Sequence, residues 1–132
     1  MIFSNLLNFS LYFGSSLALL GVALTTYVKI TPYDEIKLIR DGNVAASLSF
    51  LGTVLGMVIA LSSVITHSVS IMDMLSWGSM SLFIQLVIWS AVNAIFGNLK
   101  KAIAEDQDIA HGIILGGASF AVGSIEAACL VY

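Results

Sequence analysis

Charged side chains are scarce in this sequence. The chain of 132 residues contains five Lys and Arg and eight Asp and Glu, so charged residues make up only 10% of it. A soluble globular domain has roughly 25% charged residues, and a nucleic-acid-binding surface needs clustered Lys and Arg. The composition therefore excludes an ordinary soluble domain, and the small net charge of −3 gives no sign of a nucleic-acid partner.

The sequence has little cysteine and lacks the motifs of common catalytic sites. Cys129 is the single cysteine, so it cannot form a disulfide within the chain, and in an apolar stretch it acts mainly as a small hydrophobic residue. The sequence has no Walker loop, no dinucleotide-binding fingerprint and no Cys/His metal cluster. His67, Ser70 and Asp73 have the side chains of a hydrolase triad, but no nucleophile elbow surrounds them. We therefore expect no enzyme activity, catalytic residue, metal or cofactor.

Long apolar runs are what the chain has instead, and 58% of its residues are hydrophobic. A membrane-spanning helix needs about 20 predominantly apolar residues. The chain has four such runs, which are approximately Leu6–Val28, Val44–Thr66, Leu75–Phe96 and Ile109–Val131. They occupy most of the length, so the sequence predicts an all-α polytopic membrane protein with a single four-span domain over residues 1–132.

The few basic residues fall in two gaps between these runs, Lys29–Arg40 and Lys100–Lys101. The third gap, His67–Met74, contains Asp73 but no Lys or Arg. Loops rich in Lys and Arg stay on the cytoplasmic side of a membrane. The distribution therefore predicts that both basic gaps face the cytoplasm and that both termini lie outside, on the periplasmic side of a bacterial inner membrane.

The first basic gap has the end signals of a short interfacial helix. Thr31 is a candidate cap, Pro32 fits the first helical position, and Gly42 can end the helix. One apolar face is expected to turn toward the lipid or the bundle. It is formed by Tyr33, Ile36 and Ile39.

The second basic gap follows a similar plan, with Asn98 as a candidate cap before residues 99–106. Asn43 and Asp108 come directly after the two gaps and are expected to cap the second and fourth spans. These connectors also contain the basic side chains that we expect to dock a cytoplasmic partner, namely Lys37, Arg40, Lys100 and Lys101.

The chain shows signs of an internal repeat. Sliding the sequence along itself places Asp41 on Asp106 and Gly52 on Gly117. Residues 1–66 and 67–132 would then be two helical hairpins with the same orientation, related as parallel repeats. The alternative is chance similarity between two helices rich in small residues.

Small residues recur at intervals of three or four in the second and fourth spans. Small residues at this spacing let helix backbones approach closely within lipid. They predict either an oligomer or gating interface, or packing inside one bundle. The glycines concerned are Gly52, Gly56, Gly112, Gly116 and Gly123.

Glu126 is the single acidic residue well inside a predicted span. A charge at the centre of a bilayer costs about 2.5 to 3.5 kcal/mol on insertion scales, so we expect Glu126 to face an interior, a cavity or a partner. Gln85 and Asn93 in the third span either line the same ion or substrate pathway or form hydrogen bonds between helices. Asp73 is expected at the outer mouth of such a pathway.

A resemblance to a known family rests on blocks spread over nearly the whole chain. They are Lys29-Ile30-Thr31-Pro32, Asn43-x-Ala45-Ala46-Ser47-Leu48-x-Phe50-x-Gly52, Leu61-Ser62-Ser63, Ile84-Gln85-Leu86 and Ala127-Ala128-Cys129. With these blocks the chain resembles the YjfL family of small bacterial inner-membrane proteins, catalogued as domain of unknown function 350. The resemblance implies a four-span protein without an established activity. Members of that family are associated with PspA-like membrane-remodelling proteins and polyamine-related enzymes. For this chain, the resemblance therefore implies a role at the stressed membrane or in handling cations.

Two functional hypotheses follow. In the first, a non-enzymatic and oligomeric membrane component docks peripheral membrane-stress or remodelling proteins, such as a PspA-like partner, through its cytoplasmic connectors. In the second, a homo-oligomer forms a channel or carrier for small cations or polyamines between its subunits, with Glu126 along the path.

Overall fold

The computed structural model describes residues 1–130. It contains four long helices, α1 (Ile2–Ile30), α3 (Val44–His67), α4 (Ile71–Phe96) and α5 (Ile109–Cys129), and two short ones, α2 (Glu35–Arg40) and the π-helix η1 (Lys100–Glu105). The four long helices are long and apolar enough to cross a membrane, and no strand occurs in the described residues. The predicted all-α polytopic membrane fold is confirmed. The predicted end of the fourth span at Val131 lies outside the described residues.

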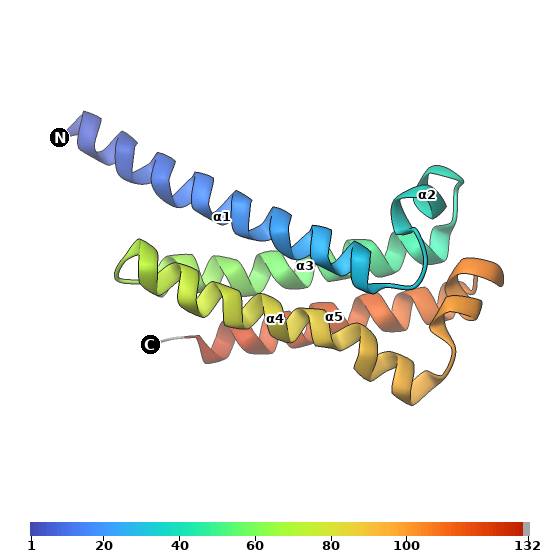
Figure 1. Cartoon of the computed structure of the whole chain (residues 1–132). Helices are drawn as coiled ribbons and strands as arrows, with labels where there is room; N and C mark the ends of the chain where they lie inside the picture. Colours follow the sequence, from blue (N-terminus) through green and yellow to red (C-terminus); the bar gives the residue numbers. More distant parts are fainter. Residues whose placement is uncertain (131–132) are drawn as a thin grey trace.

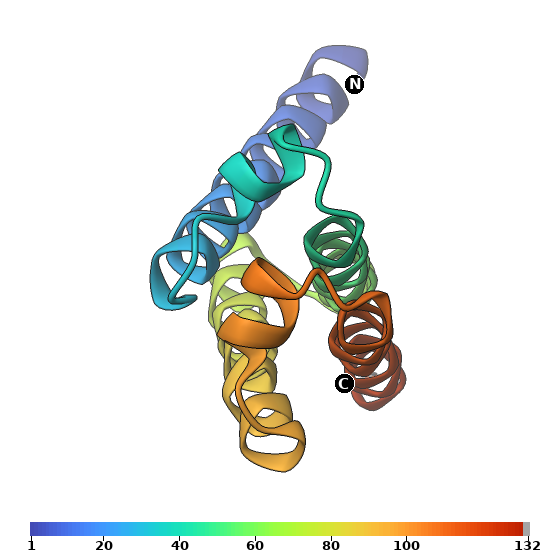
Figure 2. The same ribbon diagram turned by 90° about the vertical axis from the view of Figure 1, so that its right-hand side faces the viewer.

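Both short helices lie at one end of the bundle (Figure 1). We call this the connector end, and we call the other the terminal end, because the start of α1, the end of α5 and the turn between α3 and α4 lie there. Seen along the bundle, α2 and η1 lie over the ends of the long helices (Figure 2). Each half of the chain has a long helix, a connector and a second long helix, while the alignment of residues 1–66 with 67–132 as a repeat stays a prediction.

α1 packs against the bundle mainly through its second half. Its buried residues are Ser16, Ala23 and Tyr27, whereas residues 1–11 are all exposed. The first turns of α1 lean away from α3 (Figure 1). Large apolar side chains there, such as Phe3 and Phe9, therefore face the surroundings of the bundle, which in a membrane is lipid or another protein.

α3 and α5 lie so close together that their backbones touch. Added Cβ atoms at the predicted small-residue positions would clash with the backbone of the facing helix. The facing pairs are Gly52 with Gly116, Gly56 with Ser119, Gly112 with Ala45, and Gly123 with Gly56. The structure thus uses this face inside one chain, so α5 occupies the surface that an oligomer contact through α3 would need.

α3 and α5 each begin at a residue whose side chain caps the helix, and these are the two cap residues that the sequence predicted. The Asn43 Oδ1 atom accepts from the Ala46 N–H at 3.0 Å, and the Asp108 Oδ1 atom accepts from the Ala110 N–H at 3.0 Å. Asn43 also donates through Nδ2 to the Ile103 carbonyl at 2.8 Å. This second bond joins the start of α3, directly after the first connector, to η1, so the two connectors are linked to each other.

The first connector differs from its prediction. α1 continues to Ile30, and Thr31 ends it instead of capping a new helix. α2 starts later because the Asp34 side chain accepts from the Lys37 N–H at 3.2 Å. On so short a helix the later start changes which residues face the bundle, because each residue turns the helix by roughly 100°. Glu35 is fully buried, while Ile36, on the face expected to turn toward the lipid or the bundle, is 41% exposed.

Candidate functional site

Glu126 lies near the end of α5, beside α4. Its Oε2 atom accepts from the Ser81 hydroxyl at 2.7 Å, while its Oε1 atom is buried without a hydrogen-bond partner. The carboxyl opens into a groove of about 190 Å³ between α4 and α5. The groove is lined by Trp77, Met80, Ser81, Ile84, Cys129 and Leu130. Glu126 is therefore bonded within one chain and also reaches an open, mostly apolar groove.

Gln85 lies one helical turn after Ser81 on α4 and is fully buried. With its amide oriented so that both polar atoms are satisfied, Gln85 Nε2 donates to the Ser119 carbonyl at 3.2 Å and Oε1 accepts from the Gly123 N–H at 2.9 Å. The same amide borders the Glu126 carboxyl. Gln85 therefore links α4 to α5 next to Glu126.

Three hydroxyl groups continue from Gln85 toward the connector end. The Thr53 hydroxyl on α3 lies 3.4 Å from the Ser119 hydroxyl on α5 and 3.5 Å from the Tyr27 hydroxyl on α1, and it also donates to the Ser49 carbonyl at 2.9 Å. Thr53, Ser119 and Tyr27 are at most 1% exposed. A threonine hydroxyl has one hydrogen, so Thr53 can donate to only one of these three oxygens at a time.

Glu35 lies at the connector end of these hydroxyls. The Tyr27 hydroxyl interacts with its carboxyl, but neither carboxyl oxygen has a partner within hydrogen-bonding distance and angle. Burial raises the pKa of Glu35 to about 8, and the Tyr27 hydroxyl offsets part of the rise. Burying a charged carboxylate without a partner is costly, so Glu35 holds its proton up to a higher pH than an exposed glutamate.

These side chains lie next to one another in one set, which we call the polar column, and Gln85 joins it through the backbone carbonyl of Ser119. It contains residues from α2 and all four long helices and extends from the connector end to the groove near the terminal end. In order, its members are Glu35, Tyr27, Thr53, Ser119, Gln85, Ser81 and Glu126.

Sequence reasoning identified Glu126 and Gln85 in the polar column but missed the rest as a set. Ser81 precedes Gln85 by one turn of α4, a spacing that could have indicated a shared polar face. In the sequence, Ser119 stood out only as one of the small residues spaced along the fourth span. Glu35 was missed because its burial depends on how α2 docks, and a sequence alone does not show that.

Asn93 and Asp73, the other two predicted pathway residues, lie outside the polar column. Asn93 accepts through Oδ1 from the Leu99 N–H at 3.0 Å at the end of α4, so it holds the approach to η1 and does not join the polar column. Asp73 accepts from the Val69 N–H at 3.1 Å, while its own N–H donates to the Ser70 hydroxyl. Asp73 and Ser70 thus close the turn between α3 and α4, and His67 bonds instead to the Ser63 carbonyl.

The connector end carries charges of both signs. Its four predicted docking residues, Lys37, Arg40, Lys100 and Lys101, are all exposed. Four acidic residues are exposed beside them, namely Asp34, Asp41, Glu105 and Asp106. Asp108 pairs with His111 at 2.8 Å, and this hydrogen bond lowers the pKa of Asp108.

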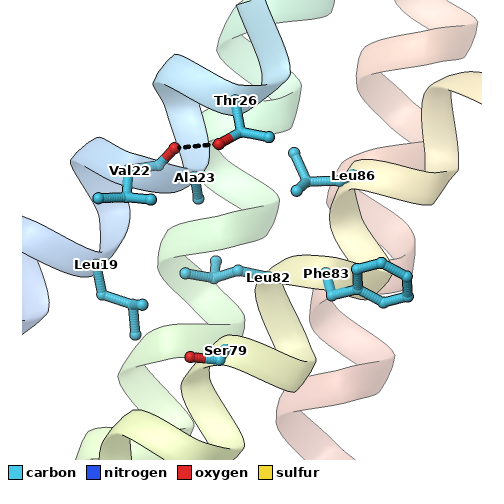
Figure 3. A pocket seen from close by; sticks show the side chains of 8 residues that line it. All are labelled: Leu19, Val22, Ala23, Thr26, Ser79, Leu82, Phe83 and Leu86. Atoms are coloured by element: carbon cyan, nitrogen blue, oxygen red, sulfur yellow. Dashed lines mark hydrogen bonds between the residues drawn. The ribbon is translucent and has the colours of Figure 1, made fainter. Parts of the chain in front are cut away.

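A second groove, of about 230 Å³, lies between α1 and α4 (Figure 3). Its lining is almost entirely aliphatic and aromatic. The Thr26 hydroxyl, which also lines it, donates to the Val22 carbonyl within α1 at 2.8 Å. The groove thus suits lipid chains better than a polar ligand. Among residues 1–130, no three His, Cys, Asp or Glu side chains gather as metal ligands.

The fold and these sites are those of an all-α polytopic membrane protein with four long helices and a polar column through its core. The family model described as Domain of Unknown Function (DUF350) matches residues 1–130, and the chain belongs to that family, as its sequence blocks indicated.

Named relatives agree with this membership. The chain is 41% identical over 131 residues to the UPF0719 inner membrane protein YjfL of Escherichia coli (strain K12), across 99% of this chain and 98% of the relative. The same values hold for the protein of that name from Escherichia coli O157:H7. Neither the family description nor these names denote an enzyme. No solved structure matches the chain.

Proposed function

We propose that this protein is a non-enzymatic component of the bacterial inner membrane whose connector end faces the cytoplasm and docks a peripheral membrane protein. The observation that carries this proposal is that Lys37, Arg40, Lys100 and Lys101 are exposed on two short helices at the connector end. The buried Leu99 and Ile103 hold η1 to the bundle, in a cluster with Tyr33, Ala45 and Leu115. The positive-inside rule favours the cytoplasmic side for this end.

The chemistry of the partner follows from the charge pattern. With Lys29, which is also exposed at this end, five exposed bases stand beside four exposed acids, so the surface selects a partner with a matching pattern of both signs and not simply an acidic protein. A charged helical surface of a PspA-like peripheral membrane protein has this chemistry, and that is the partner class implied by the family resemblance.

Binding to a PspA-like protein from the same organism tests this proposal. The chain is placed in nanodiscs, and a quadruple variant replaces Lys37, Arg40, Lys100 and Lys101 with Gln. Each exposed ion pair contributes roughly 0.2–1 kcal/mol, so together they should change the affinity by about tenfold or more. A control with Arg for the three Lys and Lys for Arg40 should bind normally. Binding that is equal in all three proteins would refute the role of these charges.

A second candidate function is passage of small cations or polyamines between the subunits of a homo-oligomer. The groove beside Glu126 favours it, because the carboxyl reaches a surface that a neighbouring subunit could complete. The exposed first turns of α1 are a suitable contact for such a neighbour. This path would differ from the interior of one bundle, where α3 and α5 are in backbone contact.

Flux of potassium and spermidine into liposomes tests this candidate. The native chain should carry either ion faster than protein-free liposomes do, and Glu126→Gln should abolish the difference by removing the charge that attracts cations. Ser124→Ala is a control, because the Ser124 hydroxyl bonds only to the Phe120 carbonyl within its own helix at 2.9 Å. Absence of flux by the native chain under any gradient would rule this candidate out.

A further inference from the structure

Two carboxyl groups mark the ends of the polar column, and the sequence predicted only one of them. Glu35 is fully buried at the connector end, and both of its carboxyl oxygens lack a hydrogen bond. Glu126 lies toward the terminal end, and one of its carboxyl oxygens also lacks a hydrogen bond. An ionisable group within a membrane-spanning helix is costly and by default marks an ion or proton pathway, and Glu126 lies in such a helix. Glu35 lies outside the spans, on α2, and is distinguished by its burial without a hydrogen bond.

The side chains between them are of the kind that can exchange protons. Tyr27, Thr53 and Ser119 are hydroxyl groups from three different helices, with 3.5 Å between the first two and 3.4 Å between the last two. These distances are long for O–H···O hydrogen bonds. The Thr53 hydroxyl donates to the Ser49 carbonyl at 2.9 Å, so a relay requires its hydrogen to leave that bond and turn toward Tyr27 or Ser119.

The packing of the bundle limits what can move along this column. Gly52 and Gly116 bring α3 and α5 into backbone contact, and Gly56 does the same at Ser119. A hydrated metal ion cannot pass a seam closed in this way, because a close-packed interior has few voids larger than a water molecule. A proton needs no such space, since it moves by exchange between neighbouring oxygen atoms.

We propose that the polar column conducts protons through a single bundle, between Glu35 at the connector end and Glu126 at the terminal end. This function is independent of docking, and it differs from cation passage between subunits in both the ion and the route.

Each transfer in the column conserves atoms and charge. Glu35 gives its proton to the Tyr27 oxygen, Tyr27 releases its own hydrogen to Thr53, and Thr53 releases its own to Ser119. Each hydroxyl gains one proton and loses one, so no oxidant or reductant is needed. The Gln85 amide does not exchange protons readily, and the groove is lined by Ser81 and Glu126 but not by Ser119. The step from Ser119 to Glu126 therefore requires a water molecule that reaches Ser119 past Gln85. Rotation of the hydroxyl groups then restores the starting state.

The groups that face the two carboxyls set the pH range. Tyr27 and Tyr33 are the titratable neighbours of Glu35, and neither carries a positive charge to hold Glu35 ionised. Ser81 and Gln85 face Glu126, and Cys129 lines its groove. Because Glu35 has no cationic partner, it can bind and release a proton near neutral pH.

Proton flux into liposomes with a pH-sensitive dye inside tests the proposal. A potassium gradient with valinomycin supplies the driving force. The native chain should raise the flux above that of protein-free liposomes, and Thr53→Val should return it to that level, because Val has the same shape without the hydroxyl. Thr26→Val is the matched control, since the Thr26 hydroxyl bonds only to the Val22 carbonyl. Glu35→Gln should also return the flux to that of protein-free liposomes.

Two results would overturn the proposal: flux by the native chain no higher than in protein-free liposomes, or native flux retained in Thr53→Val and Glu35→Gln. Circular dichroism and elution volume identify a variant that fails to fold. Infrared spectroscopy of the native chain provides a second test. A band of a protonated, buried carboxyl should disappear as the pH rises past the Glu35 pKa, and a band that persists unchanged in Glu35→Gln would also refute the proposal.

Discussion

At the residue scale, Glu35 is the least expected feature of the molecule. An acid in the first turn of a surface helix ordinarily faces water, where it interacts favourably with the helix dipole. Here the side chain is fully buried beside Tyr27 and has no cationic partner. A residue that opposes local preference in this way is a marker of function or of strain.

The raised pKa of Glu35 predicts that stability depends on pH. The pKa of Glu35 is about 8 in the folded chain and about 4.3 in the unfolded chain. Between these values the folded state keeps a proton that the unfolded state releases, so stability is greatest at low pH and falls as the pH rises, by up to roughly 1.4 kcal/mol per pH unit.

Thermal unfolding in detergent between about pH 5 and pH 8 checks this prediction. The native melting temperature should fall with rising pH, whereas Glu35→Gln should show a much weaker dependence, since its amide does not titrate. Asp34→Asn is a suitable control because Asn can still cap α2. An equal dependence on pH in native and Glu35→Gln proteins would contradict the burial of an unpaired carboxyl.

At the element scale, the contact between α3 and α5 organises the bundle. A Cβ at Gly116 would lie 2.5 Å from the Leu48 carbonyl oxygen, whereas a Cβ at Gly117 would meet nothing within 4 Å. Gly116→Ala should therefore force the helices apart and destabilise the fold by about 1–3 kcal/mol. Gly117→Ala should be neutral or stabilising, because Ala is a better helix former than Gly.

Unfolding by SDS in mixed micelles measures this difference between adjacent residues. The α3–α5 contact predicts an earlier midpoint for Gly116→Ala only. If both variants unfold at the native midpoint, the two helices do not pack through this face.

The same elements show how far the sequence allowed prediction. Apolar run length located the four long helices, and the Asn43 and Asp108 caps marked the starts of α3 and α5, because these signals are local. The start of α2 was misplaced because Thr31 and Asp34 can both cap a helix, and the tertiary contacts of Tyr33 and Glu35 decide between them. The polar column could not be predicted as a unit, since its links, such as Thr53 to Ser119, cross between distant helices.

At the scale of the whole molecule, the two ends differ in chemistry. The connector end is charged, whereas the terminal end has few charges and exposes the first turns of α1. Both proposals involve α2. The proposed docking surface includes its exposed Lys37 and Arg40, and the proposed proton path begins at its buried Glu35. Lys37 lies on that helix close to Glu35 in sequence, although it points to the surface.

Site-specific photo-crosslinking in living cells tests the docking claim most directly. A photoreactive amino acid replaces Lys37 or Lys101 at the connector end or, as a control, the exposed Ser76 on α4 near the terminal end. If the connector end docks a PspA-like protein in the cytoplasm, crosslinks detected by an antibody to that protein should form from Lys37 and Lys101 and not from Ser76. Crosslinks from Ser76 alone, or none from any position when both proteins are present, would contradict the account.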